Sequence, residues 1–468
     1  DEYDIQIEFG DIGNILAYLS IAQPLMSCWC RGRESNPHGG CHYHLKIACL
    51  PIPPPRHKWS DTENRVAWQE LFCILEKIFL GSPAGKAGGL PWARLTGTPR
   101  NGKLCSCLAW RKTMDDGVRT FLQKTGPVLC VDIGSGTQDV LLARPGLEVH
   151  NWPRFVLPSP ARLAAQRIRE LTLLKQPVWL YGENIGGGFG LAVRDHIKAG
   201  FAVHSTASAA SALHDNPEVV RSMGVQIAEQ CPAGAVPVPL SDYSPEFFAG
   251  LLRQAGLPLP HLVLAGCQDH GFHPNGNRMG RMQAWTALLQ ASALPANWIY
   301  EQPPAECTRL LALQKKTGGP VADTGTCALL GALCVPEVMK RSWREGITII
   351  NVGNSHTVAA LVYQGQVRGI YEHHTGMRTL QEYLADLEQF RRSWLPCEEV
   401  LAHGGHGTAF GPYCEEAGGY EPTYILGPKR EFLQGQGQFL APYGDMMLAG
   451  CFGLLWGWAH RGDAAGRL

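Results

Sequence analysis

The stretch "VLCVDIGSGTQDVLLA", residues 128–143, joins two apolar runs through a Gly-Ser-Gly turn with a carboxylate on each side. Backbone N–H groups in such a turn can converge on phosphate oxygens, because glycine allows positive φ and a close approach of the chain. The hydroxyls of Ser135 and Thr137 add donors. Asp132, at the end of the first run, is placed to hold a hydrated Mg²⁺ beside those phosphates, since Mg²⁺ prefers oxygen ligands. The pattern therefore predicts a phosphate-binding turn.

Two familiar nucleotide motifs do not fit this turn. The chain has no G-x-x-x-x-G-K-[ST] sequence, and the turn leads into a second strand-like run instead of a helix, which excludes the dinucleotide fingerprint. For this stretch alone, a plain β-hairpin with a glycine turn and solvated carboxylates remains an alternative, because short glycine turns are common.

Two further segments combine glycine with polar residues. The segment "AGCQDHGFHPNGNRMGRM" follows an apolar run and offers a general base, imidazoles and anion-binding guanidiniums, although a self-contained polar loop is the alternative. The segment "YGENIGGGFGLAVRD" indicates either an anion site at a helix N-terminus or a flexible connection. The candidate residues of the first segment are Asp269, His270, His273, Arg278 and Arg281.

The elements that must position these residues follow a regular pattern after residue 126. Short apolar runs alternate with helical patterns, which is typical of an α/β protein, and each run ends in glycine or a polar loop, where ligands gather in open α/β sheets. Residues 131–143, "VDIGSGTQDVLLA", align with residues 350–362, "INVGNSHTVAALV". This long-range repeat predicts two domains of similar construction, each opening with a glycine hairpin, and two half-sites that face one cleft.

The first 124 residues differ from the rest of the chain in composition and in hydrophobic pattern. They hold seven of the sixteen cysteines, with Pro-rich and Gly-rich text and one helical pattern over residues 64–80. In "CWCRGRESNPHGGCHYH" the first two cysteines are only one residue apart, which is unlike the C-x(2–4)-C spacing of structural zinc sites. We interpret residues 1–124 as a poorly ordered extension, either appended or a mis-called reading frame.

The amino-acid composition limits the classes of partner that the chain is expected to bind. Lysine plus arginine and aspartate plus glutamate both count 41, so no overall charge draws the chain to nucleic acid or to anionic lipid. The N-terminus is acidic, and the apolar run "LAGCFGLLWGWA" is too short to span a bilayer. We expect a cytoplasmic protein that binds neither nucleic acid nor membrane, with reduced thiols because its cysteines are scattered.

Three segments resemble one superfamily. "DIGSGTQDV" resembles the first phosphate loop of the actin, Hsp70 and sugar-kinase ATPases, "NVGNSHTVAAL" resembles the second, and "VLAHGGHGTAFGP" resembles the loop that cups adenosine. They occur in the superfamily's order. The resemblance implies an α/β fold with two actin-like (ribonuclease H-like) domains around a nucleotide cleft, over residues 125–345, with an inserted loop region, and 346–461. A tail over residues 462–468 follows.

The same resemblance implies ATP and Mg²⁺ as ligands. It places Asp132 on the water shell of the metal and makes Asp139 or Asp269, with His270, the candidate catalytic base. Asn351 stands where the superfamily usually has aspartate, which argues against vigorous hydrolysis, because a neutral amide cannot offset metal charge. The implied nucleotide contacts are Gly134, Ser135, Gly136, Thr137, Gln138, Asn351, Gly353, Asn354, Ser355, Gly404, Gly405 and Gly407.

A narrower resemblance concerns "DIGSGTQD", "QDHGFHPNGNRMGRM" and "GGHGTAF", which together resemble a prokaryotic family labelled pyruvate formate-lyase-activating enzyme. A radical-generating activase holds its iron–sulfur cluster with a C-x-x-x-C-x-x-C run, and the chain contains none, so an activating role would be ATP-driven. We expect ATP hydrolysis or phosphoryl transfer, acting on a small-molecule acceptor or a client enzyme. The alternatives are a non-catalytic nucleotide-sensing module and a small-metabolite kinase.

Overall fold

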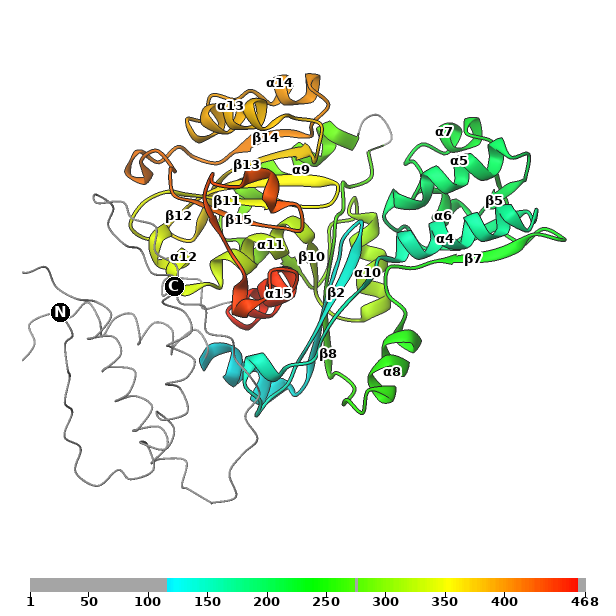
Figure 1. The fold of residues 1–468 in the computed structure, drawn as a ribbon, viewed down its shortest axis with the longest axis horizontal. Coiled ribbons are helices and arrows are strands. Elements are labelled where there is room, and N and C mark those ends of the chain that lie inside the picture. The colour runs from blue at the N-terminus through cyan, green and yellow to red at the C-terminus, as the bar shows by residue number, and fades with distance from the viewer. Residues whose placement is uncertain (1–115, 274–276, 462–468) are drawn as a thin grey trace, which may run out of the picture. The chain divides into compact units, whose positions relative to one another are not determined.

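The computed structural model describes residues 116–273 and 277–461, which hold three β-sheets and the helices around them (Figure 1). The predicted helix at residues 64–80, the cysteine- and histidine-rich segment near the N-terminus, and the tail at 462–468 lie outside these ranges.

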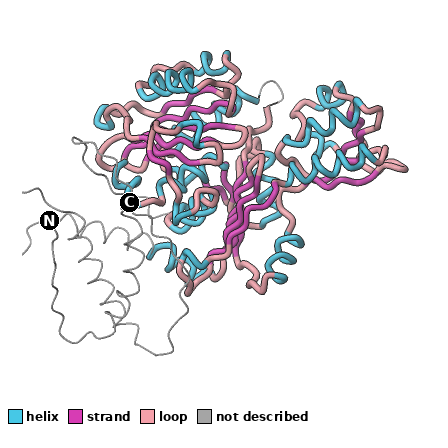
Figure 2. The backbone as a smooth tube through the Cα atoms, in the orientation of Figure 1, coloured by secondary structure: helices cyan, strands magenta, loops and turns pink. Residues whose placement is uncertain are grey.

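The first sheet has six strands in the order β3-β2-β1-β8-β10-β9. Strands β1, β2 and β3 form an antiparallel meander, whereas β8 runs parallel to β1 and β10 runs parallel to β8. Figure 2 shows the strands side by side in magenta. The bounds are β1 Val128–Ile133, β2 Thr137–Ala143, β3 Arg154–Pro158, β8 Leu262–Cys267, β9 Ile299–Tyr300 and β10 Val321–Asp323.

The second sheet repeats this plan in the order β14-β13-β12-β11-β15-β16. Strands β11, β12 and β13 form the meander, β15 runs parallel to β11, and β16 runs parallel to β15. The predicted α/β class with two actin-like domains is confirmed by this duplicated strand order. The bounds are β11 Ile347–Val352, β12 His356–Tyr363, β13 Gln366–His374, β14 Gly407–Phe410, β15 Thr423–Leu426 and β16 Gln438–Phe439.

A third sheet lies between β3 and β8 in sequence, within residues 125–345, for which an inserted loop region of unspecified position was expected. Its four strands, in the order β6-β5-β4-β7, are all parallel and share a separate apolar core with α4 and α5, which lie beside them in Figure 1. The segment is therefore a small α/β unit. Its bounds are β4 Val178–Gly182, β5 Val203–Ser205, β6 Val225–Ile227, β7 Val236–Leu240, α4 Pro160–Leu173, α5 Gly190–Lys198, α6 Ala207–Ala210 and α7 Pro217–Ser222.

Helices α11 (Thr324–Leu333) and α15 (Ala449–Ala459) join the two duplicated halves. Both are buried along almost their whole length and share one apolar core with β1 and β11. The helices touch through their backbones: a Cβ on Gly331 would collide with the carbonyl oxygen of Ala449, and a Cβ on Gly453 with that of Cys327. Glycine is therefore needed at the contact.

Two of the remaining helices begin at a capping side chain. The Ser244 hydroxyl accepts the backbone N–H of Phe247 at the start of α8, and Thr379 and Glu382 form a capping box at the start of α13. None of the helices in the described part of the chain is long and apolar enough to cross a membrane. Residues 116–125 are also helical. The other bounds are α8 Pro245–Gln254, α9 Asn277–Ala291, α10 Thr308–Thr317, α12 Pro336–Ser342, α13 Leu380–Arg391 and α14 Cys397–Ala402.

The helix contact predicts a large effect of one methyl group. Gly331→Ala should lower the free energy of unfolding by about 3 kcal/mol, because the added Cβ meets a backbone carbonyl that cannot rotate away. The matched control is Gly250→Ala in α8, where a Cβ meets nothing within 4 Å. It should be neutral or stabilising by up to about 1 kcal/mol. Urea denaturation of both variants measures the difference, and equal effects would contradict the close contact.

Candidate functional site

A cavity of about 820 Å³ opens where parallel strands of the three sheets end. Residues just after β1, β8, β10, β11 and β15 all line it, as do residues that follow β4 and β7 in the small sheet. Ligands of α/β proteins bind beyond the carboxyl ends of such strands. The lining residues that directly follow the first five strands are Gly134, Gln268, Thr324, Gly353 and Gly427.

The two glycine turns face each other in this cavity. Gly134 N–H donates to the carbonyl oxygen of Thr137, and Gly353 N–H donates to that of His356, each at 2.9 Å, so the turns have the same local geometry. A Cβ on Gly136 would lie 2.5 Å from Nδ2 of Asn354, which shows how closely the turns approach. Such convergence of backbone donors suits phosphate oxygens.

Of the residues predicted for the first turn, Gly134, Ser135 and Thr137 line the cavity. Gln138 is buried instead, and its Nε2 donates to the carbonyl oxygen of Pro158 at 3.1 Å. This amide therefore anchors the hairpin to β3. In the second turn Asn351, Gly353, Asn354 and Ser355 all line the cavity.

Asp132 and Asp139 form a buried carboxylate pair at the cavity. They lie opposite each other in the β1–β2 register, and each is only 8% exposed. Thr324 Oγ1 donates to Asp132 Oδ1 at 2.7 Å, whereas Asp139 Oδ1 is buried without a hydrogen-bond partner among the described residues. Burial raises the pKa of Asp132 to about 6, and burial together with the charges of Asp132 and Asp445 raises the pKa of Asp139 to about 8.

This pair fits a hard divalent cation. Two adjacent carboxylates offer oxygen ligands only, and one of their oxygens has no protein donor. Mg²⁺ takes oxygen ligands from one or two carboxylates and keeps several waters. Asp132, predicted as the metal ligand, and Asp139 beside it are therefore the residues that could hold Mg²⁺.

The loop after β8 brings Asp269 and His270 to the cavity wall. Asp269 Oδ1 accepts the N–H of Gly271 at 2.8 Å, and Oδ2 accepts that of Leu310 at 2.9 Å. Burial raises its pKa. Each carboxylate oxygen thus already serves a backbone amide, so this side chain holds the loop against the start of α10.

Arg281 of α9 joins the two duplicated halves behind this loop. Its Nη1 and Nη2 donate to both carboxylate oxygens of Asp323 at 2.8 and 3.0 Å, and its Nε donates to Glu372 Oε2 at 2.9 Å. A further bond from Nη1 reaches the carbonyl oxygen of Asp269 at 2.7 Å. Asp323 ends β10 in the first sheet and Glu372 lies in β13 of the second, so one buried guanidinium connects the sheets.

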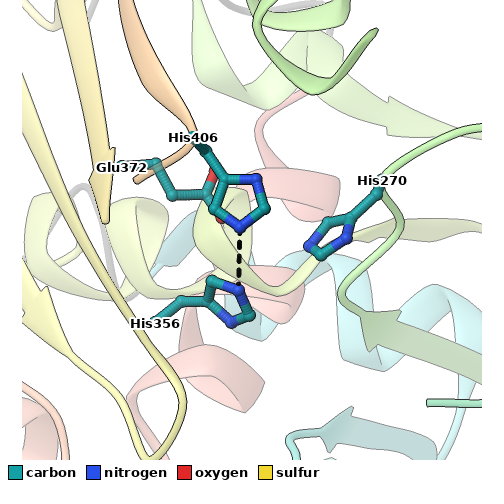
Figure 3. Close-up of side chains that lie close together, drawn as sticks. All are labelled: His270, His356, Glu372 and His406. Atoms are coloured by element: carbon teal, nitrogen blue, oxygen red, sulfur yellow. Dashed lines mark hydrogen bonds between the residues drawn. The ribbon is translucent and has the colours of Figure 1, made fainter. Parts of the chain in front are cut away.

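Three histidines surround Glu372 at the same wall (Figure 3). One polar atom each from His270, His356, His406 and Glu372 lie within 4.8 Å of one another. The Nε2 atoms of His356 and His406 are 3.1 Å apart. Burial lowers the pKa of His356 to about 4 and that of His406 to about 3, and it also lowers that of His270, so the three rings are neutral near pH 7.

The glycines predicted to cup adenosine lie elsewhere. Gly404, Gly405 and Gly407 are not among the residues that line the described cavity; a Cβ on Gly405 would collide with Val400 and His373, so this loop packs against α14 and β13 and directs His406 inward. The end of β15 lines the cavity in their place. Its residues are Leu426, Gly427 and Pro428.

Sequence reasoning missed several residues of the wall. His406 lies between two glycines of a quoted motif and His356 lies three residues after Gly353 in another, and this proximity was the available signal. No sequence signal of this kind marks Glu372, which lies in the segment "YEHH". The glycine-rich segment "YGENIGGGFG" does line the cavity, through Asn184 and residues 185–188, although α5 begins only at Gly190.

The duplicated strand order and the shared cleft define an actin-like α/β protein. The sequence matches over residues 185–432 the family described as "Putative pyruvate format-lyase activating enzyme (DUF1786)". Because this match spans more than half of the chain, the protein belongs to that family. No curated protein matches the sequence.

Solved structures include distant likenesses. The ethanolamine utilization protein EutJ from Carboxydothermus hydrogenoformans is 9% identical, with 75% of this chain and 99% of that chain covered and a TM-score of 0.26. The activator of 2-hydroxyisocaproyl-CoA dehydratase from Clostridium difficile with bound ADPNP is 9% identical, with 73% and 98% covered and a TM-score of 0.25. MreB5 of Spiroplasma citri bound to ADP is 11% identical, with 70% and 95% covered and a TM-score of 0.29. The fold assignment rests on the strand order.

The carboxylate pair predicts a pH-dependent stability. A carboxyl whose folded pKa is raised binds its proton more tightly in the folded state, so its stabilising effect is full below the unfolded pKa of about 4 and is lost as pH rises through the folded pKa. Asp139→Asn, which stays neutral, should therefore match the wild type near pH 4 and should exceed its Tm by several degrees above pH 8, the pKa being about 8. Thermal melts in chelator at several pH values measure this.

The matched control for Asp139→Asn is Asp195→Asn on the exposed face of α5. Its melting curve should follow the wild type at every pH. Parallel pH profiles for Asp139→Asn and the wild type would contradict the raised pKa of Asp139.

Removing Arg281 should be costly for a different reason. Arg281→Met leaves Asp323 and Glu372 buried without their cation, and we expect a loss of about 3–5 kcal/mol in the free energy of unfolding. The control is Arg392→Met, whose guanidinium pairs with Glu388 on the surface at 2.7 Å and should contribute about 1 kcal/mol or less. Urea denaturation measures both variants. An equal decrease in the free energy of unfolding would contradict a special contribution of the buried ion pairs of Arg281.

Proposed function

We propose that the protein binds Mg-ATP in the 820 Å³ cavity and hydrolyses it or transfers its terminal phosphoryl group. The observation that supports this most directly is the pair of matched glycine turns, which face each other in a cavity that also holds the buried pair Asp132 and Asp139. Phosphoryl transfer needs donors and a cation placed around the phosphates more than covalent protein chemistry.

The phosphates would lie between the two turns. The backbone N–H groups of Ser135, Asn354 and Ser355 and the hydroxyls of Ser135, Thr137 and Ser355 supply the donors, while the N–H groups of Gly134 and Gly353 close the turns themselves. Ser159 keeps the first turn in shape, since its Oγ donates to the carbonyl oxygen of Ser135 at 2.9 Å. The donors are thus in place before a ligand binds, which lowers the cost of ordering them.

Asp132 would hold the Mg²⁺, directly or through its waters. The bound ion would offset negative charge on the phosphates. Asp139 is the proposed general base, because it lies opposite Asp132 and its Oδ1 has no hydrogen-bond partner among the described residues. Its raised pKa keeps it protonated near neutral pH without the metal, and a bound Mg²⁺ would favour the ionised form that can take a proton. Asp269, the other candidate base, would instead keep the loop of His270 in position, since its oxygens already accept two backbone N–H groups.

The nucleoside would lie against the apolar side of the cavity. Leu426, Gly427 and Pro428 after β15 provide one face, and Met446 and Met447 provide another. This places the base at the second domain, as the sequence predicted, but on a different loop from the one at Gly404–Gly407. A small-molecule acceptor or a group of a client enzyme would reach the terminal phosphate from the side of the small sheet, where Asn184 lines the cavity.

A nucleotide-sensing role without turnover is the second candidate. Its supporting observation is an asymmetry between the two hairpins: Asp132 lies opposite Asp139 in the first, whereas Asn351 lies opposite Val358 in the second. The second turn therefore lacks the acid pair. Tight binding with negligible phosphate release, with or without candidate acceptors, would favour this role.

Calorimetric titration of the full chain tests the proposal. ATP and ADP should bind more tightly with Mg²⁺ than in chelator, and NAD should not bind. Asp132→Ala should weaken Mg-ATP binding about 10- to 100-fold, because it removes a charged ligand worth roughly 1.5–3 kcal/mol. The same variant should bind ATP in chelator as the wild type does.

The matched control is Asp195→Ala, which removes an exposed carboxylate from α5 and should leave binding unchanged. The absence of binding by any adenine nucleotide at millimolar concentration would refute the proposed function. An unchanged Mg²⁺ dependence in Asp132→Ala would refute the role of that residue alone.

A further inference from the structure

The cluster around Glu372 has no part in the proposed phosphoryl chemistry. Its four side chains come from separate places in the chain: the loop after β8, the first residue of β12, the middle of β13 and the loop before β14. They converge at the wall of the cavity, which His270 and His356 line (Figure 3). Three imidazoles around one buried carboxylate are a set of side chains that can bind a metal ion together.

We propose that His270, His356, His406 and Glu372 form a binding site for a divalent transition-metal ion of the zinc type. The inference does not depend on nucleotide binding. It rests on the spacing of the ligand atoms, on the unpartnered imidazole nitrogens and on the charge of the cluster.

The spacing is close to that of a coordination sphere. Zinc–nitrogen bonds of about 2.0–2.1 Å in tetrahedral geometry place neighbouring ligand atoms about 3.3 Å apart. The Nε2 atoms of His356 and His406 are 3.1 Å apart, and the four polar atoms lie within 4.8 Å of one another. Small rotations of the imidazole rings would bring the two most widely separated ligand atoms within bonding distance of the ion.

The imidazole nitrogens that face the cluster have no carbonyl, carboxylate or hydroxyl partner in the part of the chain that the structure describes. His270 Nε2 is buried with no hydrogen bond, and the Nε2 atoms of His356 and His406 contact each other, a contact that an ion between them would replace. His356 has the arrangement of a typical metal ligand, because its Nδ1 lies 2.9 Å from Ser355 Oγ and its Nε2 faces the cluster. A partner on the far nitrogen fixes the ring and leaves the other lone pair for the metal.

Glu372 is held firmly and still has a free lone pair. Its Oε2 accepts from Arg281 and from Trp285 Nε1 at 3.1 Å, but among the described residues its Oε1 accepts only from Gln268 Nε2, at 2.9 Å. A carboxylate oxygen can accept twice, so Oε1 can also bind a metal.

The charges of the cluster favour a cation. Arg281 is shared by two carboxylates, Asp323 and Glu372, and no other lysine or arginine among the described residues is paired with either of them. One negative charge is therefore left in a buried place, where an uncompensated charge is costly. A divalent ion on Glu372 would offset this negative charge, and the cluster with Arg281 and Asp323 would then carry a single positive charge.

The donor set selects the kind of ion. Three imidazole nitrogens and one carboxylate oxygen suit Zn²⁺, Fe²⁺, Ni²⁺ or Cu²⁺, whereas Mg²⁺ and Ca²⁺ prefer oxygen throughout. This site therefore differs in kind from the carboxylate pair at Asp132. A metal here would lie at the cavity wall next to Ser355 of the second turn. With four protein ligands the site would be closed, so the ion would fix the wall unless it takes a fifth ligand.

Metal titration of the chelator-treated full chain, without nucleotide, tests this site. Zinc bound after dialysis should fall by one equivalent per chain in His270→Ala and in His406→Ala relative to the wild type. The affinity of this site should drop by more than about 100-fold, because even groups that only orient a ligand contribute roughly 10- to 100-fold. The matched control is His403→Ala, an exposed histidine three residues before His406, which should keep the full equivalent.

Cobalt as the probe separates this site from the cysteine-rich N-terminal segment. Co²⁺ held by imidazoles and a carboxylate should give visible tetrahedral absorption without a thiolate charge-transfer band, and His270→Ala should lose that absorption. His270 lies in a loop, so this variant is expected to fold, and its Tm and circular dichroism check that it does. Full zinc stoichiometry and an unchanged cobalt spectrum in folded His270→Ala would overturn the proposal.

Discussion

The buried guanidinium of Arg281 is the interaction on which the arrangement of the site depends. It reaches Asp323 at the end of β10 and Glu372 in β13, so a single side chain spans the two duplicated sheets. Asp323 also accepts the N–H of Gly325 at the start of α11, the helix that links those sheets. Because a buried charge must be paired, the positions of both sheets and of this helix are fixed together.

The duplication then explains why the two halves share one cavity. Each half contributes a glycine turn at the carboxyl end of its first strand, and helices α11 and α15, in backbone contact at Gly331 and Gly453, join the halves. The halves are alike in backbone but not in chemistry. Only the first carries the acid pair, while the second carries Asn351 and three of the four cluster residues, His356, Glu372 and His406, so the two sides of the cavity can do different things.

The cavity consequently has two chemically distinct ends. The end at Asp132 and Asp139 offers oxygen ligands and suits a hard cation beside phosphates, whereas the end at His270 and His356 offers imidazole nitrogen and suits a softer one. Ser355 connects the two ends of the cavity, because it lies in the second glycine turn and also contacts His356. A ligand between the two glycine turns would therefore lie close to His270 and His356.

The sequence by itself determined the features that depend on neighbouring residues. The hairpin at residues 128–143 and its repeat at 350–362 follow from apolar runs and glycine turns, and Asp132 does line the cavity. The tertiary structure alone decided which distant segments meet. Glu372 lies in the second sheet and His270 follows a strand of the first, so they meet only where the two halves pack together, which leaves no local pattern. Likewise, glycines occur beside both β14 and β15, but β15 pairs with β11 whereas β14 is an outer strand, so Gly427 and not Gly405 lines the cavity.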